Sequence, residues 1–146
     1  LQGTFATRAH QKRRAAAVLR RLVRDVEPWL AVARLRASPK RDGARDTPTS
    51  AELPADAALL AAAWQPYLQC LPHDTLCGCS TDAVARAMDA RLDDATVQAR
   101  GLRADALDAL LDHDAVEARS SRAAWRPHLV LRNRAARPRR GLAFAT

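Results

Sequence analysis

The sequence has little of what strands, membrane spans and glycine-rich binding loops require. Aromatic residues make up 4% of the 146 residues, and there are five glycines. Alanine, leucine and arginine dominate, and scarce β-branched and aromatic residues favour helices over strands. No apolar run approaches the roughly 20 residues of a membrane-spanning helix. We therefore expect an all-α protein with one domain, because this length suffices for a single hydrophobic core.

Patterns typical of catalytic sites are missing as well. The sequence contains no glycine-rich phosphate loop, nucleophile elbow or metal-binding pair of histidines on a helix. His113 stands between Asp112 and Asp114, which is more typical of a solvated helix end than of an acid–base pair. The adjacent carboxylates of Asp93 and Asp94 fit a helix boundary in the same way. We expect a protein that is not an enzyme.

Charge is unevenly distributed along the chain. The net charge is +8, and 22 of the 24 basic residues are arginine. Residues 1–45 carry 12 basic and 3 acidic side chains, and residues 119–146 carry 8 basic and none acidic. Residues 46–118 carry 4 basic and 13 acidic side chains. This distribution predicts partial neutralisation within the molecule and an anionic partner outside it, either nucleic acid or an acidic protein.

A long basic helix is expected near the N-terminus, over about residues 7–35. Its apolar residues recur at three- and four-residue steps, which gathers them on one face that must be buried. Pro28 predicts a kink or break before Trp29, because proline removes a backbone hydrogen bond. The residues expected on the buried face are Val18, Leu19, Leu22, Val23, Val26 and Trp29.

Four segments follow from the pattern of helices, loops and charge. Residues 1–36 are the N-terminal basic helix, and residues 37–80 are an insertion made of a linker, a short helix and a cysteine-containing loop. Residues 81–118 are expected to form a helix pair that completes a three-helix bundle, with a boundary near residue 94. Residues 119–146 form an extended basic tail, because proline and arginine punctuate it and it lacks a core of its own.

The short helix of the insertion is expected over residues 55–69. It places Leu59, Leu60 and Trp64 toward the core, and Pro66 ends it.

Three cysteines and a histidine form a candidate metal site. Cys70, His73, Cys77 and Cys79 form the pattern C-x2-H-x3-C-x-C, which holds four potential zinc ligands within ten residues. This is not a common zinc spacing, because C-x-C brings two thiolates unusually close along the backbone. A loop with partly buried thiols is the simpler interpretation, and a disulfide from Cys70 to Cys77 or Cys79 is an alternative in an oxidising compartment. We assign no metal and keep these four residues as candidates.

Residues 18–24, Val-Leu-Arg-Arg-Leu-Val-Arg, resemble the Leu-Tyr-Arg-x-Leu-Leu-Arg motif of the LYR family. Val18 and Leu19 replace the Leu and Tyr that name the motif. The Glu-Pro-Trp of residues 27–29 is similar to a Glu-x-Trp that follows the motif in an LYR-type accessory subunit of respiratory complex I. Residues 83–113 resemble the arginine-bearing second helix and the leucine-rich third helix of the family.

This resemblance implies an LYR-like three-helix bundle that binds mitochondrial acyl carrier protein. Arg20, Arg21 and Arg24 would dock that acidic partner, which contributes an acyl-phosphopantetheine, and the chain itself would bind no cofactor directly. The implied function is that of a non-catalytic accessory subunit of a mitochondrial respiratory complex, with complex I favoured. The implied location is the matrix or the matrix side of the inner membrane. The arginine-rich, acid-free opening of the chain also resembles an organellar targeting segment.

Two alternatives belong to other classes of protein. The first is a lineage-specific mitochondrial ribosomal protein whose basic ends bind ribosomal RNA. The second is a small zinc-binding protein that depends on Cys77 and Cys79. In the first alternative the tail contacts RNA, and in the accessory-subunit interpretation it contacts neighbouring subunits. The tail residues expected to make these contacts are Arg132, Arg134, Arg137, Arg139 and Arg140.

Overall fold

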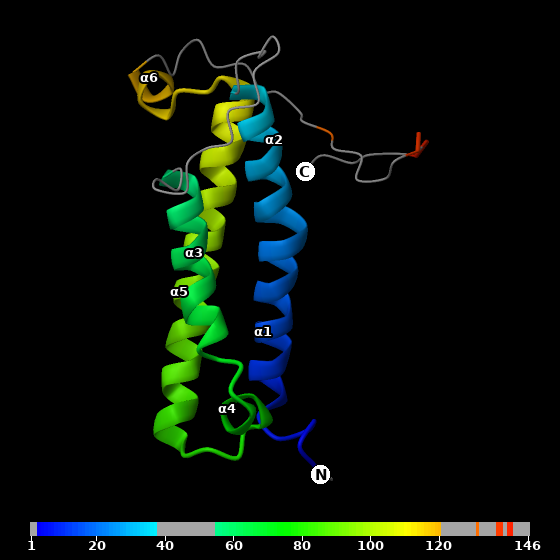
Figure 1. Cartoon of the computed structure of the whole chain (residues 1–146), viewed down its shortest axis with the longest axis vertical. Coiled ribbons are helices and arrows are strands. Elements are labelled where there is room, and N and C mark those ends of the chain that lie inside the picture. The colour runs from blue at the N-terminus through cyan, green and yellow to red at the C-terminus, as the bar shows by residue number, and fades with distance from the viewer. Residues whose placement is uncertain (1–2, 38–54, 121–130, 132–136, 139, 142–146) are drawn as a thin grey trace, which may run out of the picture. The chain divides into compact units, whose positions relative to one another are not determined.

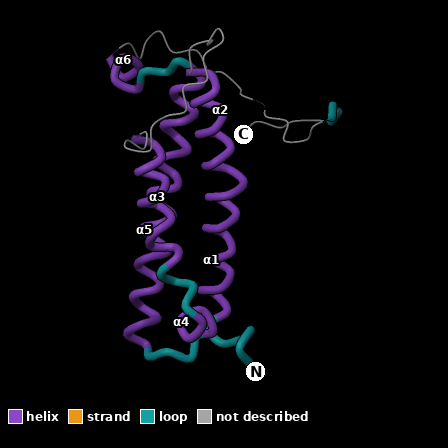
Figure 2. Tube along the Cα trace, in the orientation of Figure 1, coloured by secondary structure: helices purple, strands orange, loops and turns teal. Residues whose placement is uncertain are grey.

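The computed structural model describes residues 3–37, 55–120, 131, 137, 138, 140 and 141. Every regular element in these residues is a helix, which confirms the predicted all-α class (Figure 2). The chain divides into two compact units, residues 1–113 and residues 114–146. In the second unit the described helix is α6 (Ala115–Ser120), at whose start the Asp114 carboxylate accepts hydrogen bonds from two backbone amides.

The first unit begins with one long helical rod (Figure 1). It consists of α1 (Ala9–Arg21), a π-helical turn η1 (Leu22–Val26) and α2 (Glu27–Ala37). In the π turn the Glu27 amide donates to the carbonyl of Leu22, five residues earlier. Such a turn rearranges the hydrogen bonds next to Pro28, which has no N–H to donate. The predicted break before Trp29 is therefore wrong, and the helix continues through Pro28.

The segment assigned to an insertion supplies a helix of the bundle. Helix α3 (Ala55–Leu68) packs along α5 and also contacts α1, and Pro66 lies inside it. Its buried residues are Ala63 and Tyr67, whereas Leu59, expected in the core, is 55% exposed. Residues 55–68 therefore belong to the core structure.

Helix α5 (Asp82–Leu111) is one continuous helix of 30 residues. Thr81 caps its start by accepting a hydrogen bond from the Val84 amide. The helix pair predicted for residues 81–118 is wrong, because the helix passes through Asp93 and Asp94 without interruption. Arg14 on α1 forms an ion pair with Asp93, so this acid belongs to a helix contact.

The core lies where the α1–α2 rod, α3 and α5 meet. Leu22, Val26, Met88 and Leu92 are fully buried at its centre. Two residues expected on the buried face of the first helix, Leu19 and Val23, are instead 39% and 44% exposed. The remaining core residues are Ala15, Val18, Leu30, Ala63, Tyr67, Cys70, Ala95, Ala99, Leu102 and Ala106.

Ion pairs join the first helical rod to α5. Arg14 lies 2.6 Å from Asp89 and 2.5 Å from Asp93, and Arg103 lies 2.9 Å from Asp25. The predicted partial neutralisation of charge within the molecule is thus confirmed for these side chains. Within the part of the chain that the structure describes, no helix has both the length and the apolar character needed to cross a membrane.

Candidate functional site at the N-terminal end of the bundle

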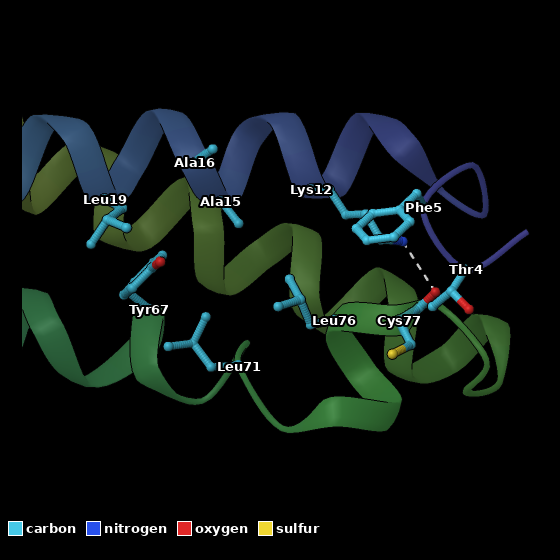
Figure 3. A pocket seen from close by; sticks show the side chains of 10 residues that line it. All are labelled: Thr4, Phe5, Lys12, Ala15, Ala16, Leu19, Tyr67, Leu71, Leu76 and Cys77. Carbon is cyan, nitrogen blue, oxygen red and sulfur yellow. Dashed lines mark hydrogen bonds between the residues drawn. The ribbon is translucent and has the colours of Figure 1, made fainter. Parts of the chain in front are cut away.

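An apolar pocket opens beside α1, along the stretch from Lys12 to Leu19 (Figure 3). Its volume is about 520 Å³. The alanines at positions 15 and 16 leave this space because their side chains are short. Phe5, at the pocket, is 90% exposed. The residues that line the pocket are Thr4, Phe5, Lys12, Ala15, Ala16, Leu19, Tyr67, Leu71, Leu76 and Cys77.

The short helix α4 (His73–Cys77) contributes to this pocket and carries a polar pair at its start. The Nε2 atom of His73 lies 3.1 Å from Oδ1 of Asp74, and both side chains are exposed. Gly78 caps the C-terminal end of the helix, and its φ of +83° is in the left-handed region. One short helix thus carries an exposed polar pair at its start and pocket-lining residues, Leu76 and Cys77, at its end.

Asp74 is fixed within its own loop. The Ser80 hydroxyl donates to the backbone carbonyl of Asp74 over 3.1 Å. The Cys79 thiol lies 3.5 Å from the same carbonyl and 3.6 Å from the Asp74 carboxylate. The loop therefore holds the backbone on which the His73 and Asp74 side chains stand.

The four candidate metal ligands do not come together as a set. Cys70 is fully buried, where its thiol lies 3.3 Å from the Pro66 carbonyl, and burial raises its pKa. Cys77 lies at the apolar pocket, and Cys79 is exposed. Within the described residues, no group of three or more His, Cys, Asp or Glu side chains is arranged to hold a metal ion. All three cysteines are free thiols, so the alternative of a disulfide does not hold in this structure.

The predicted docking arginines stand on the first helical rod. Arg20 and Arg24 are exposed and Arg21 is half-buried. Of the tail residues, Arg137 and Arg140 are exposed, and Arg132, Arg134 and Arg139 lie outside the described residues. The contacts predicted for both groups stay predictions.

The described part of residues 1–113 thus forms a small all-α helical bundle with an apolar pocket and a polar loop. Comparison with protein families identifies the module more closely. The model of the alpha-mannosidase middle domain matches residues 1–110, which is most of the chain. The chain therefore belongs to the alpha-mannosidase middle domain family. No curated protein and no solved structure matches the chain.

This match overturns the resemblance to the LYR family. The function of a respiratory accessory subunit and the alternative of a ribosomal protein fall with it. The motif at residues 18–24 misled because alternating apolar and arginine positions occur in any basic amphipathic helix. The supposed second and third helices are one helix, α5. The mitochondrial location now depends only on the arginine-rich opening of the chain, and it stays a prediction.

The sequence pattern marked the loop at residues 70–80 for its four candidate metal ligands, and it did not single out the pairing of His73 with Asp74. The available signal was a histidine and an aspartate between Pro72 and Gly78, two residues that often delimit ordered turns. The pocket could not be found this way, because its walls come from α1, the end of α3 and α4.

Proposed function

We propose that this chain is the helical module of an α-mannosidase-type glycoside hydrolase, and that the end of the bundle near α4 meets another domain of the enzyme. The family is named as a middle domain, which supports a position between other domains. The observation that carries the proposal is that one short helix, α4, bears the exposed His73–Asp74 pair at its start and lines the apolar pocket with Leu76 and Cys77.

The His73–Asp74 pair has the chemistry of an incomplete site. Imidazole is a frequent metal ligand and proton-transfer group, and a carboxylate that accepts from one ring nitrogen orients the other. His73 fits the role of a single metal ligand or proton carrier, with Asp74 as its orienting partner. Glycoside hydrolysis also requires carboxyl groups on both sides of the scissile bond. We therefore propose that another domain supplies the remaining groups.

It follows that the isolated chain is not an enzyme and binds no cofactor by itself in this proposal. The apolar pocket has the complementary role of receiving side chains of the other domain. Burying exposed apolar surface such as Phe5 contributes about 25 cal/mol for each Å² removed from water. Association there would also remove water from the surroundings of the polar pair.

The experiment compares two histidines in the natural full-length polypeptide that carries this chain. His73→Ala is expected to reduce kcat/KM for 4-nitrophenyl α-mannoside by at least about 100-fold, because a proton-transfer group or metal ligand is lost. Asp74→Asn is expected to reduce it by about 10- to 100-fold, as is typical for a partner that orients a ligand. His113→Ala is the matched control, because His113 is also exposed and also precedes an aspartate.

The proposal fails if the His73 and His113 variants hydrolyse the substrate at the same rate while both retain the helical circular dichroism of the parent protein. The 146-residue chain by itself should show no hydrolysis of the same substrate. Turnover by the isolated chain would show that it holds a complete catalytic site.

A further inference from the structure

Arg8, in the turn before α1, is hydrogen-bonded to Ser80 and Asp82. Ser80 lies at the C-terminal end of the loop (residues 70–80) that contains α4, and Asp82 is the first residue of α5. Arg8 donates from NH1 to the Ser80 carbonyl over 2.9 Å and from NH2 to the Asp82 carboxylate over 2.6 Å. Arg8 itself has left-handed backbone angles, with φ 48° and ψ 43°. A non-glycine residue adopts this conformation only where its surroundings fix it. One guanidinium thus joins the first turn of the chain to the start of α5.

Lys12 makes a second connection one turn further along α1. Its ammonium group donates to the Thr7 carbonyl over 2.5 Å and to the Cys77 carbonyl over 3.1 Å. Cys77 is the last residue of α4, where backbone carbonyls lack partners within the helix. Lys12 therefore ties the end of α4 to the N-terminal turn.

Gly78 shows that the turn and the loop are in direct contact. A Cβ atom at this position would lie 3.1 Å from Cγ2 of Thr7 and 3.2 Å from the Thr7 carbonyl oxygen. Together with its positive φ, this close approach favours glycine at the position, because a side chain would be strained and would press on Thr7. The backbone of the loop therefore rests on the backbone of the turn between the two cation contacts.

We propose that Arg8 and Lys12 are positioning residues for the His73–Asp74 pair. The connection runs through bonds already described: Arg8 holds the Ser80 backbone, and the Ser80 hydroxyl holds the Asp74 backbone. Lys12 fixes the other end of α4. The two cations thereby set where the pair stands relative to the bundle. This inference rests on the proposed function of the pair, and it assigns a role to two residues that lie outside the pair itself.

The first test measures amide hydrogen exchange in the 146-residue chain. The Leu76 and Gly78 amides donate to the carbonyls of Pro72 and Thr75 and so report on the order of the loop. Arg8→Ala and Lys12→Met should each accelerate exchange at these two amides by at least about 10-fold, because the loop then opens more often. Core amides of α5 should change by less than twofold.

Arg13→Ala is the matched control, because Arg13 is exposed on the same helix and has no hydrogen bond or ion pair among the described residues. In the Arg13→Ala variant the Leu76 and Gly78 amides should exchange at the same rate as in the parent chain. If Arg8→Ala and Lys12→Met also leave the loop amides within twofold of the Arg13→Ala control, the inference is overturned.

The second test separates positioning from a merely structural role by using the full-length polypeptide. Arg8→Ala should lower kcat for 4-nitrophenyl α-mannoside at least about 10-fold while KM stays within twofold, because the displaced pair affects chemistry more than substrate binding. Arg8→Lys should restore part of the loss, since an ammonium group can still donate to the Ser80 carbonyl. Unchanged kcat in the Arg8 and Lys12 variants overturns the inference, even where the loop exchanges faster.

The two proposals fail in different ways. A fully active His73→Ala variant removes the proposed function of the pair, whereas the exchange experiment still decides whether Arg8 and Lys12 hold the loop. An inactive His73→Ala variant combined with fully active Arg8 and Lys12 variants removes only the positioning role.

Discussion

Truncation of Leu22 provides the most direct test of the helical bundle. Leu22 lies in the π turn between α1 and α2 and is 0% exposed, whereas Leu19, three residues earlier, is 39% exposed. Both residues belong to the apolar face expected from the sequence. Leu22→Ala and Leu19→Ala therefore remove the same atoms from two positions that differ in burial.

The expected magnitudes follow from this difference. Leu22→Ala removes three buried carbon atoms, worth roughly 2.4 kcal/mol of transfer free energy, and leaves a cavity in the core. We therefore expect the free energy of unfolding to fall by about 3 to 4 kcal/mol. Leu19→Ala should cost about 1 kcal/mol, because the side chain is partly in water already and borders an open pocket.

Urea unfolding followed by circular dichroism at 222 nm measures both values. The midpoint should decrease for Leu22→Ala while the slope m stays constant, since the surface exposed on unfolding is nearly unchanged. Equal losses for the two variants, or a loss below about 1 kcal/mol for Leu22→Ala, would refute the packing of the first rod against α3 and α5.

Three further predictions concern single sites. Gly101→Ala should stabilise the chain by about 0.5 to 1 kcal/mol in thermal unfolding, because Gly101 lies inside α5 and an added Cβ meets nothing within 4 Å; a destabilised variant would contradict this. Ellman's reagent should label Cys79 much faster than Cys70, because burial raises the pKa of the Cys70 thiol, and equal rates would show that Cys70 is accessible. Arg34 hydrogen-bonds Asp56 and lowers its pKa, so this pair stabilises the fold above the unfolded-state pKa and the contribution is lost as the pH falls through about 4 and below. In the Asp56→Asn variant the urea midpoint should therefore fall less steeply as the pH is lowered below about 4, and the free energy of unfolding at neutral pH should decrease by under about 1 kcal/mol. A midpoint that depends on acid pH as in the parent chain would contradict the assignment.

The first helix shows why the sequence pattern alone does not predict which helix face is buried. Leu22 and Val26 are buried as the helical period indicates, yet Leu19 and Val23 face outward. Each of the four residues lies three or four positions from another of them, so the apolar residues form two adjacent strips along the helix. Either strip could face the core, and the spacing alone therefore allows two orientations of the helix. Contacts with α3 and α5 select one orientation, and those helices are far away in the sequence.

The extent of α5 gives a second example. Two adjacent aspartates near the middle of a helix predict a boundary when only neighbours in sequence are considered. In the structure Asp93 is bound by Arg14, which is 79 residues away, and the helix continues. Local charge patterns therefore mislead where a partner from another helix provides the opposite charge.

The sequence by itself determined the all-α class and the presence of an amphipathic helix that includes Leu22 and Val26, because composition and helical period act over a few neighbouring residues. Only the tertiary structure decided that α3 belongs to the bundle and that an apolar pocket opens beside α1. It also decided that Arg8 and Lys12 donate hydrogen bonds to backbone carbonyls of the loop that carries His73. The contacts of Arg8 and Lys12 join residues 65 to 74 positions apart, and no local pattern encodes which distant oxygen a side chain will reach.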